Sequence, residues 1–231
     1  MAGMAGASVA NESLHVIVLA AGAATRFGAA KQLAKLDGQP LLRLMLNRAQ
    51  ELAGTSVSVV LGAHATEIAP LLAHTTASVL INRNWSEGVA SSIRLGVERL
   101  PGACSGAMLV LADQAQVSAG DLSQLASVWR RQPLLAAAAS YSGGIGVPAV
   151  FPRTAFPSLL QLRGDRGAKA WLLAHADRVV GVPMPRAAVD IDTVEDLQRA
   201  SEMALQEATS APPQKEISGA EVAAVLEIES P

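Results

Sequence analysis

The first residues that could do chemistry are two cations, Arg26 and Lys31, which follow a loop of small residues. From Leu19 to Thr25 the loop reads LAAGAAT, and small residues let backbone N–H groups approach an anion closely. The crowded oxygens of a triphosphate need such donors together with fixed positive charge. An ordinary strand-to-helix loop with two solvated cations fits the same composition, so both interpretations stay open at this point.

The spacing of the loop excludes two well-known phosphate-binding motifs. A Walker A loop needs Gly, four residues and then Gly-Lys, whereas five residues separate Gly22 from Gly28 and Ala29 follows. A dinucleotide-binding loop needs G-x-G-x-x-G, and Ala24 occupies its middle glycine position.

Carboxylates follow two other apolar stretches. Asp113 comes directly after the run Ala107–Leu111 and one alanine, and Asp190 and Asp192 alternate around Ile191. In an extended segment the last two carboxylates point to one face, which suits a divalent cation beside phosphates. A turn position for Asp113, and a helix cap at Asp192 or the next residue, are the alternatives.

A polar cluster begins at Asn82 and continues through Gly88 to Ser92. Asparagine and serine side chains at such a position could read a base or a ribose by hydrogen bonds. A loop followed by a capped helix, with Ser86 as the cap, explains the same residues equally well. We expect Trp85, within this cluster, to lie in the core.

The elements that must position these residues alternate along the chain. Short apolar runs predict strands at 14–20, 57–61, 78–81, 107–111, 134–140, 148–151 and 179–182. Amphipathic stretches predict helices at 40–53, 66–73, 86–100, 118–131, 154–161, 168–175 and 194–207. Most of the candidate residues follow a predicted strand.

This alternation predicts an α/β fold, a Rossmann-like and mainly parallel central sheet flanked by helices. Ligands of such sheets bind beyond the carboxyl ends of the strands, which is where the candidate residues lie. We predict one domain over residues 13–205, a flexible N-terminus over 1–12 and a flexible tail over 206–231. The tail is rich in Pro, Ser and Glu and carries a possible short helix near 219–228.

Composition narrows the function classes. The net charge is -2 and aromatic residues make up only 3%, which disfavours a nucleic-acid partner. Charged or polar residues or glycine interrupt every apolar run, so no membrane span is predicted, and Met1–Asn11 lacks the features of a signal peptide. The single Cys104 excludes an intramolecular disulfide, and the four histidines show no metal-ligand spacing. A protein of the reducing cytoplasm acting on a small molecule fits these features.

Several segments together resemble the MobA/MocA-like nucleotidyltransferase family, over roughly Leu14 to Ala204. In chain order they are LAAGAATRFGAAK from Leu19, GQPLL from Gly38, NRNWSEGVASSIRLG from Asn82, LADQ from Leu111, GVPAVF from Gly146, LRGDRGAKAWL from Leu162 and VDIDTVEDL from Val189. Each motif is weak alone, but all in register are a strong signal.

Within this family the chain most resembles the molybdenum cofactor cytidylyltransferases, which join CTP to molybdopterin. Members that use GTP tend to carry Gly-Gly where this chain has Ala21-Gly22, so the methyl group of Ala21 is expected to favour CTP. The resemblance also implies Mg²⁺ as the cofactor and a molybdoenzyme or its chaperone as a possible partner.

The resemblance assigns roles residue by residue. Arg26, Lys31 and Asp113 are expected to be catalytic, and Asp113, Asp190 and Asp192 to hold the metal. The predicted nucleotide-binding residues are Leu19, Ala20, Ala21, Gly22, Thr25, Arg26, Lys31, Asn82, Gly88 and Ser92. The predicted acceptor-binding residues are Arg163, Arg166 and Lys169, for which a solvated basic face is the alternative.

Two departures from the family pattern and two competing functions qualify this assignment. Ala24 stands where the family has Ser or Gly, and Ala115 stands where Pro usually follows the Asp-Gln pair. The first alternative is a nucleotidyltransferase with a sugar phosphate or polyol phosphate as acceptor. The second is a nucleotide-binding chaperone or accessory module that inserts cofactor into a partner enzyme without turnover.

Overall fold

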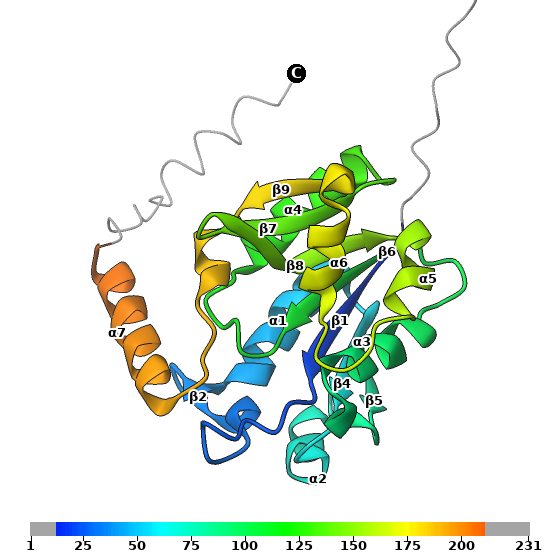
Figure 1. The fold of residues 1–231 in the computed structure, drawn as a ribbon. Coiled ribbons are helices and arrows are strands. Elements are labelled where there is room, and N and C mark those ends of the chain that lie inside the picture. Colours follow the sequence, from blue (N-terminus) through cyan, green and yellow to red (C-terminus); the bar gives the residue numbers. More distant parts are fainter. Residues whose placement is uncertain (1–12, 211–231) are drawn as a thin grey trace, which may run out of the picture.

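The computed structural model describes residues 13–210, with side chains as far as residue 202. Its centre is a seven-stranded sheet in the order β5-β4-β1-β6-β8-β7-β9 (Figure 1). The strands are β1 (Leu14–Ala20), β4 (Val57–Leu61), β5 (Ser78–Ile81), β6 (Gly106–Leu111), β7 (Ala136–Tyr141), β8 (Gly144–Pro152) and β9 (Val179–Pro183). Neighbouring strands are parallel except where β8 pairs with β6 and β7, so the predicted fold class is confirmed.

Strand β1 lies at the centre because its sequence is apolar on both faces. All of its residues are buried. Val16 and Val18 point into one core, and Ile17 and Leu19 point into the other. A strand with such a continuous apolar run is stable only between two layers of helices.

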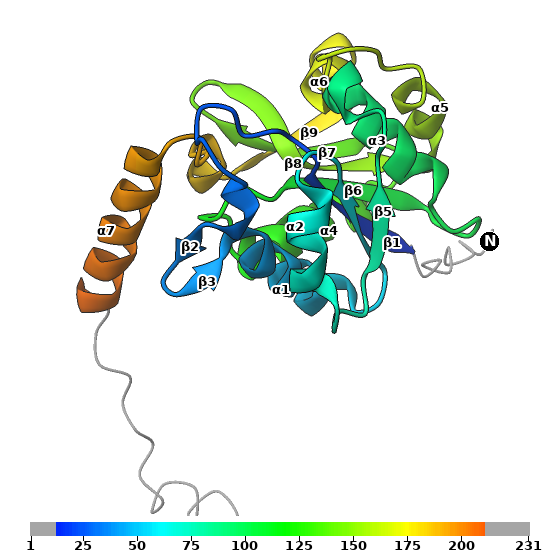
Figure 2. The ribbon, with the colours of Figure 1, turned by 90° about the horizontal axis from the view of Figure 1, so that it is seen from below.

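Helices cover both faces of the sheet (Figure 2). One face packs against α1 (Leu41–Ala53), α2 (Ala65–Ile68) and α4 (Ala119–Arg131). The other packs against α3 (Val89–Glu98), α5 (Phe156–Leu159) and α6 (Ala168–Ala174). The chain moves outward from β1 to β5 and then returns to β6 on the other side of β1. A crevice at the carboxyl ends of β1 and β6 is therefore expected at this topological switch point.

The predicted helix at 86–100 is the main correction to the expected elements. The chain instead forms a 3-10 turn, η3 (Trp85–Glu87), and then α3. Gly88 separates them with a φ of 99°, a conformation that costs an L side chain energy and breaks the helical path. Gly88 is the residue that precedes α3, so the expectation that Ser86 caps this helix is wrong.

Other differences are local. The predicted helices at 66–73 and 154–161 are each split between a short α-helix and a 3-10 turn, η2 (Ala69–Leu72) and η4 (Arg153–Ala155). A small hairpin of β2 (Lys35–Leu36) and β3 (Gln39–Pro40) was not predicted. Helix α7 (Val194–Ser210) continues past the predicted domain boundary at 205. The predicted N-terminal segment 1–12 and helix at 219–228 lie outside the described residues.

Between residues 13 and 210, no helix combines the length and apolar character that crossing a bilayer requires.

Helix α4 begins with a capping box formed by Ser118 and Asp121. The Ser118 hydroxyl accepts a hydrogen bond from the Asp121 backbone N–H at 3.1 Å, and the Asp121 carboxylate accepts one from the Ser118 backbone N–H at 2.8 Å. Two N–H groups that the helix leaves without a carbonyl are thereby satisfied.

We predict that Ser118→Ala lowers the free energy of unfolding by about 1 kcal/mol, because one capping acceptor is lost. Urea denaturation followed by circular dichroism measures the change. Ser123→Ala, on an exposed position of the same helix, is the matched control and is expected to leave stability unchanged or slightly higher. Equal stability of wild type and Ser118→Ala would contradict the capping role.

Candidate functional site

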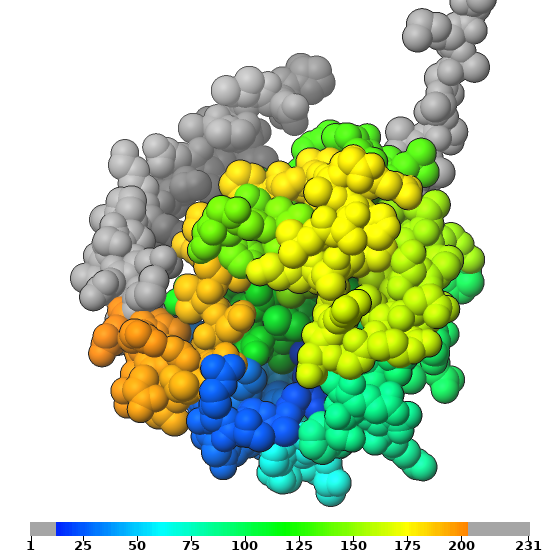
Figure 3. All heavy atoms as spheres, in the orientation of Figure 1, coloured from blue at the N-terminus to red at the C-terminus, as the bar shows by residue number. Residues whose placement is uncertain are grey.

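A cavity of about 470 Å³ opens at the carboxyl ends of β1 and β6, at the switch point of the sheet. Figure 3 shows the hollow between the loop after β1, drawn in blue, and the yellow-green segment near residue 165. Its volume is typical of a site for a small organic ligand. Of the predicted site residues, those that line it are Leu19, Ala20, Ala21, Gly22, Thr25, Arg26, Lys31, Gly88, Ser92, Asp113 and Asp192.

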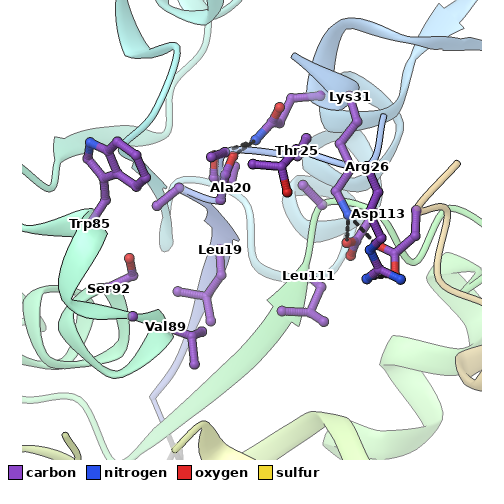
Figure 4. Close-up of a pocket in the computed structure, with 18 of the residues that line it drawn as sticks. Leu19, Ala20, Thr25, Arg26, Lys31, Trp85, Val89, Ser92, Leu111 and Asp113 are labelled. Carbon is purple, nitrogen blue, oxygen red and sulfur yellow. Dashed lines mark hydrogen bonds and ion pairs between the residues drawn. The ribbon is translucent and has the colours of Figure 1, made fainter. Parts of the chain in front are cut away.

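Two cations and two carboxylates meet at one end of the cavity (Figure 4). The Lys31 Nζ lies 2.5 Å from Asp113 Oδ2 and 2.8 Å from Asp192 Oδ1. The Arg26 guanidinium donates to Asp192 Oδ2 at 2.6 Å. The Lys31 and Asp113 side chains are only 14% and 16% exposed, whereas Arg26 is 74% exposed. The central ion pair is therefore shielded, and the outer one is open to solvent.

Backbone hydrogen bonds bring the two carboxylates together from distant parts of the sequence. Asp113 follows β6, and its carbonyl accepts a hydrogen bond from the Ile191 N–H at 3.2 Å. Ile191 is fully buried, which anchors the segment that carries Asp192. The Gln114 amide donates to the carbonyls of Val147 and Ala187, at 3.0 and 3.1 Å. The turn after β6 is thus fixed from both sides.

Ala115 does not loosen this turn, although the family pattern has a proline there. The residue is 1% exposed, and its carbonyl accepts a hydrogen bond from Arg48 on α1 at 2.5 Å.

Electrostatics explain why the cluster stays charged. Burial acts to lower the pKa of Lys31, but the charge and hydrogen bond of Asp113, together with Asp192, outweigh it and raise that pKa above the usual value. The hydrogen bond from Lys31 lowers the pKa of Asp192, with further help from the charges of Lys31 and Arg26. Both shifts favour the charged forms, an ammonium at Lys31 and a carboxylate at Asp192.

Asp190 behaves differently from its neighbours. Burial of its carboxyl group raises its pKa to about 6, and the negative charges of Asp113 and Asp192 add to the effect. Lys31 and a hydrogen bond with Gln114 act in the opposite direction. Asp192 lines the cavity and Asp190 does not. The prediction that both carboxylates point to the same face is therefore only partly met.

The small-residue loop is held by its carbonyl groups. The buried Gln32 amide donates to the carbonyls of Ala20 and Gly22, at 2.9 and 3.1 Å. The carbonyl of Ala21 accepts a hydrogen bond from the Ala63 N–H at 3.0 Å. The ring Nε2 of His64 lies 3.3 Å from the carbonyl oxygen of Ala23. Successive carbonyls are therefore fixed by Gln32, on the 3-10 turn η1 (Lys31–Leu33), and by the residues after β4.

The N–H groups of the same loop are free. Among residues 13–210, no acceptor is bonded to the backbone N–H groups from Gly22 to Arg26. Ala24 adopts a φ of 50°, which lets the loop curve at a small steric cost for a residue with a Cβ. A curved run of unbonded N–H groups is a typical binding site for an anion.

One atom of the cluster points to a cation. Asp113 Oδ1 is buried and has no hydrogen-bond partner in the described chain, and a carboxylate oxygen in that state suits a hard divalent metal. Among the side chains of residues 13–202, no group of three or more His, Cys, Asp or Glu could hold a metal on its own. Asp113 and Asp192 fit the usual Mg²⁺ arrangement, in which one or two carboxylates act together with water and substrate phosphates.

Some predicted residues lie away from the cavity. The Asn82 side chain is buried and donates to Ser91 and Ser92 at 2.8 and 2.9 Å, so it positions the turn instead of facing a ligand. Arg163, Arg166 and Lys169 are absent from the cavity lining. The Arg163 guanidinium donates hydrogen bonds to the carbonyls of Leu160 and Leu162.

The lining residues that sequence reasoning did not assign to the site include Gln32, Trp85 and Asp165. The expectation that Trp85 belongs to the core is wrong, because it is 37% exposed. Trp85 begins a 3-10 turn beside the cavity, and this turn depends on the break at Gly88. No pattern in the local sequence indicates that position.

Comparison with known proteins identifies the family. The model of the MobA-like NTP transferase domain matches residues 16–179. The chain belongs to the MobA-like NTP transferase family. This MobA-like protein is accordingly a nucleotidyltransferase, and the match includes the loop after β1 and the end of β6. No curated protein matches the chain at a significant level.

Solved structures resemble the MobA-like protein over most of its length. Rv0371c from Mycobacterium tuberculosis H37Rv is 29% identical, covers 83% of this chain and 99% of its own, and superposes with a TM-score of 0.69. Rv0371c has also been solved in complex with manganese; that structure is 28% identical, covers 82% of this chain and 98% of its own, and has a TM-score of 0.67. A nucleotidyl transferase from Methanothermobacter shares the fold at 20% identity, with 85% and 99% coverage and a TM-score of 0.72. Molybdopterin-guanine dinucleotide biosynthesis protein A from Archaeoglobus fulgidus does so at 17% identity, with 83% and 99% coverage and a TM-score of 0.63.

We predict that Asp192→Asn lowers the free energy of unfolding by about 1 kcal/mol at neutral pH. Because the folded-state pKa of Asp192 lies below its unfolded value, its ionised form favours folding. The contribution is complete above the unfolded value of about 3.9 and is lost as the pH falls through the lower folded-state pKa. Urea denaturation of both proteins between pH 7 and pH 3 measures this gap.

Asp177→Asn is the matched control, since Asp177 is an exposed carboxylate on the turn η5 (Ala176–Arg178). A gap for Asp192→Asn that stays constant down to pH 3 would contradict the assigned ion pairs.

Proposed function

We propose that the protein transfers CMP from CTP to the terminal phosphate of molybdopterin, with Mg²⁺ as cofactor and pyrophosphate as the second product. The observation that carries this proposal is the cluster of Lys31, Asp113 and Asp192 beside a loop of unbonded backbone N–H groups. Such a site supplies both kinds of group that a metal-bound triphosphate needs, namely anion donors and carboxylates. The resemblance of the sequence to cytidylyltransferases supports the choice of CTP and molybdopterin.

The proposed reaction is an in-line displacement. An oxygen of the acceptor phosphate attacks the α-phosphorus of CTP and forms a new P–O bond. The bond from the α-phosphorus to the bridging oxygen breaks, and its electron pair leaves with pyrophosphate. The attacking oxygen is already anionic, so the protein needs to position the two reactants and stabilise charge instead of supplying a nucleophile.

Positive charge at one end of the cavity stabilises the leaving group. Lys31 uses two of its three N–H donors on Asp113 and Asp192, which leaves the third for a phosphate oxygen. Arg26 is exposed and paired on one side only, so its guanidinium can turn to the β- and γ-phosphates. The N–H groups from Gly22 to Arg26 contact the same phosphates.

The carboxylates Asp113 and Asp192 would hold the Mg²⁺ ion. When bound, the ion would neutralise charge on the phosphate oxygens of the nucleotide. Lys31 holds both carboxylates in place before the nucleotide arrives, through its ion pairs with Asp113 and Asp192. Asp190 stays outside the lining and adds negative charge behind the site.

Base selection and acceptor binding are assigned to two further segments. Ala21 lines the cavity and is 7% exposed, so its methyl group narrows the space that a base can occupy. The segment around Asp165 forms another wall, and Arg166 and Lys169 follow on the same segment. We assign the acceptor phosphate to this side of the cavity, with Arg163 helping to shape the segment.

We predict that Lys31→Ala and Asp113→Ala each lower kcat by about 10² to 10³, because each removes an electrostatic contact to the reacting phosphates. Pyrophosphate release with CTP, Mg²⁺ and molybdopterin measures kcat, and circular dichroism checks that each variant folds. Lys35→Ala and Asp177→Ala are matched controls outside the cavity and are expected to retain normal turnover. Near-normal turnover in Lys31→Ala or Asp113→Ala would contradict the assigned roles.

We predict that Ala21→Gly relaxes the preference for CTP over GTP, because removal of a methyl group makes room for a purine. The measurement is the ratio of kcat/KM for the two nucleotides, and we expect a shift of about tenfold toward GTP. Ala29→Gly removes a methyl group from the same stretch outside the cavity and should leave the ratio unchanged. A wild-type enzyme that prefers GTP would overturn the choice of CTP.

A panel of acceptors tests the substrate assignment itself. Molybdopterin, sugar phosphates and polyol phosphates are each incubated with labelled CTP and Mg²⁺, and pyrophosphate release is recorded. Turnover with molybdopterin alone supports the proposal. Turnover with a sugar or polyol phosphate instead would place the protein among nucleotidyltransferases of another acceptor class, and binding without turnover would favour a cofactor-insertion chaperone.

A further inference from the structure

Trp85 is exposed where an apolar residue of its size is normally buried. The three tryptophans differ sharply, because Trp129 and Trp171 are 1% and 6% exposed whereas Trp85 is 37% exposed. The exposed residue lines the cavity at the end opposite to Lys31 and Asp113 (Figure 4). An aromatic side chain left accessible inside a concave site is available to a ligand.

The main chain around Trp85 is fixed. The turn η3 is closed by hydrogen bonds from the Glu87 N–H to the Asn84 carbonyl at 3.0 Å and from the Gly88 N–H to the Trp85 carbonyl at 3.2 Å. Asn82 accepts from the Asn84 N–H at 2.9 Å at the beginning of the turn. Trp85 is therefore presented by a short, well-bonded turn.

Gly62 allows this turn to lie directly against the loop after β1. A Cβ at position 62 would lie 2.5 Å from the Trp85 Cβ and 2.7 Å from the Ala21 carbonyl oxygen. Position 62 must therefore lack a side chain for Trp85 and the loop to approach each other as they do. On the other side of the turn, a Cβ at Gly88 would lie 2.5 Å from Asp165 Oδ1, so the segment that carries Asp165 closes the same end of the cavity.

The two ends of the cavity differ in chemistry. Arg26, Lys31, Asp113 and Asp192 make one end ionic. Figure 4 shows Trp85, Val89 and Leu19 on the other side, with the Ser92 hydroxyl among them. A nucleoside triphosphate has the same polarity, with anionic phosphates at one end and a flat, largely apolar base at the other.

We infer that Trp85 is a nucleotide-contact residue whose indole packs against the nucleobase when the triphosphate lies toward Lys31. The inference rests on the proposed nucleotide-binding function and adds a contact that supplies affinity for the base. Every base has a π-face, so this contact strengthens binding of all nucleotides and leaves discrimination to Ala21 and its neighbours.

Intrinsic fluorescence tests the contact directly, because only one of the three tryptophans is accessible. Titration of the wild-type protein with CTP and Mg²⁺ should change the tryptophan emission, and Trp85→Phe should abolish most of that change while it still binds CTP. An equal change in wild type and Trp85→Phe would show that the signal comes from Trp129 or Trp171 and would overturn the inference.

Equilibrium dialysis separates the base from the phosphates. We expect Trp85→Ala to raise the Kd for CTP about tenfold, and Trp85→Phe to restore most of the affinity because an aromatic face is retained. The Kd for inorganic tripolyphosphate, which has no base, should be the same in all three proteins. Leu173→Ala, at an exposed apolar residue of α6 outside the cavity, is the matched control and should bind CTP normally.

The possible failures are distinguishable. Equal CTP affinity in wild type and Trp85→Ala would overturn the inference and leave the proposed function standing. A parallel loss of CTP and tripolyphosphate binding in Trp85→Ala would show a general distortion of the site and would also overturn it. Failure of the wild-type protein to bind any nucleoside triphosphate would overturn the proposed function and the inference together.

Discussion

The site depends on one shared cation. Two carboxylates placed close together repel each other, and the Lys31 ammonium lies between Asp113 and Asp192 and satisfies both. These residues come from the loop before α1, the end of β6 and the segment before α7, so the same ion pairs join three distant parts of the chain. The cluster therefore contributes to the stability of the fold as well as to the site.

The same cluster is arranged so that it can accept further charge. Within the described part of the chain, Asp113 Oδ1 has no hydrogen-bond partner, Lys31 uses two of its three donors, and Arg26 is largely in solvent. The protein thus holds the charged groups in position while part of their hydrogen-bonding capacity stays available. Preorganised groups of this kind stabilise charge on a bound phosphate without the cost of rearranging at the moment of reaction.

The loop after β1 is also preorganised, in this case through its backbone. Its carbonyls are bonded to Gln32, Ala63 and His64, while its N–H groups from Gly22 to Arg26 have no acceptor among the residues that the structure describes. Peptide groups fixed by their carbonyls cannot turn, so the free donors keep one direction. A loop of small residues would otherwise be flexible, and the buried Gln32 amide is the main reason that it can serve as a rigid anion site.

Periodicity in the sequence was sufficient to predict most of the fold, because each strand and helix depends on the local pattern of apolar residues. The strands at 57–61 and 78–81 match their predicted bounds, and the α/β class follows from the alternation. The break at Gly88 was missed. Gly164 and Asp165 lie so close to Gly88 that a Cβ there would clash, and this contact with a distant segment is not visible in the local sequence.

Residue type together with position after a strand identified the ion cluster, because charged residues at the carboxyl edge of a parallel sheet are brought together by the topology itself. Only the tertiary structure decided which side chains face the cavity. The buried Asn82 side chain bonds Ser91 and Ser92 instead of facing the cavity. Asp190 lies outside the cavity lining, and Trp85 lies at the surface of the cavity instead of in the core. The direction of a loop side chain is set by contacts with segments far away in the sequence, and no local pattern contains that information.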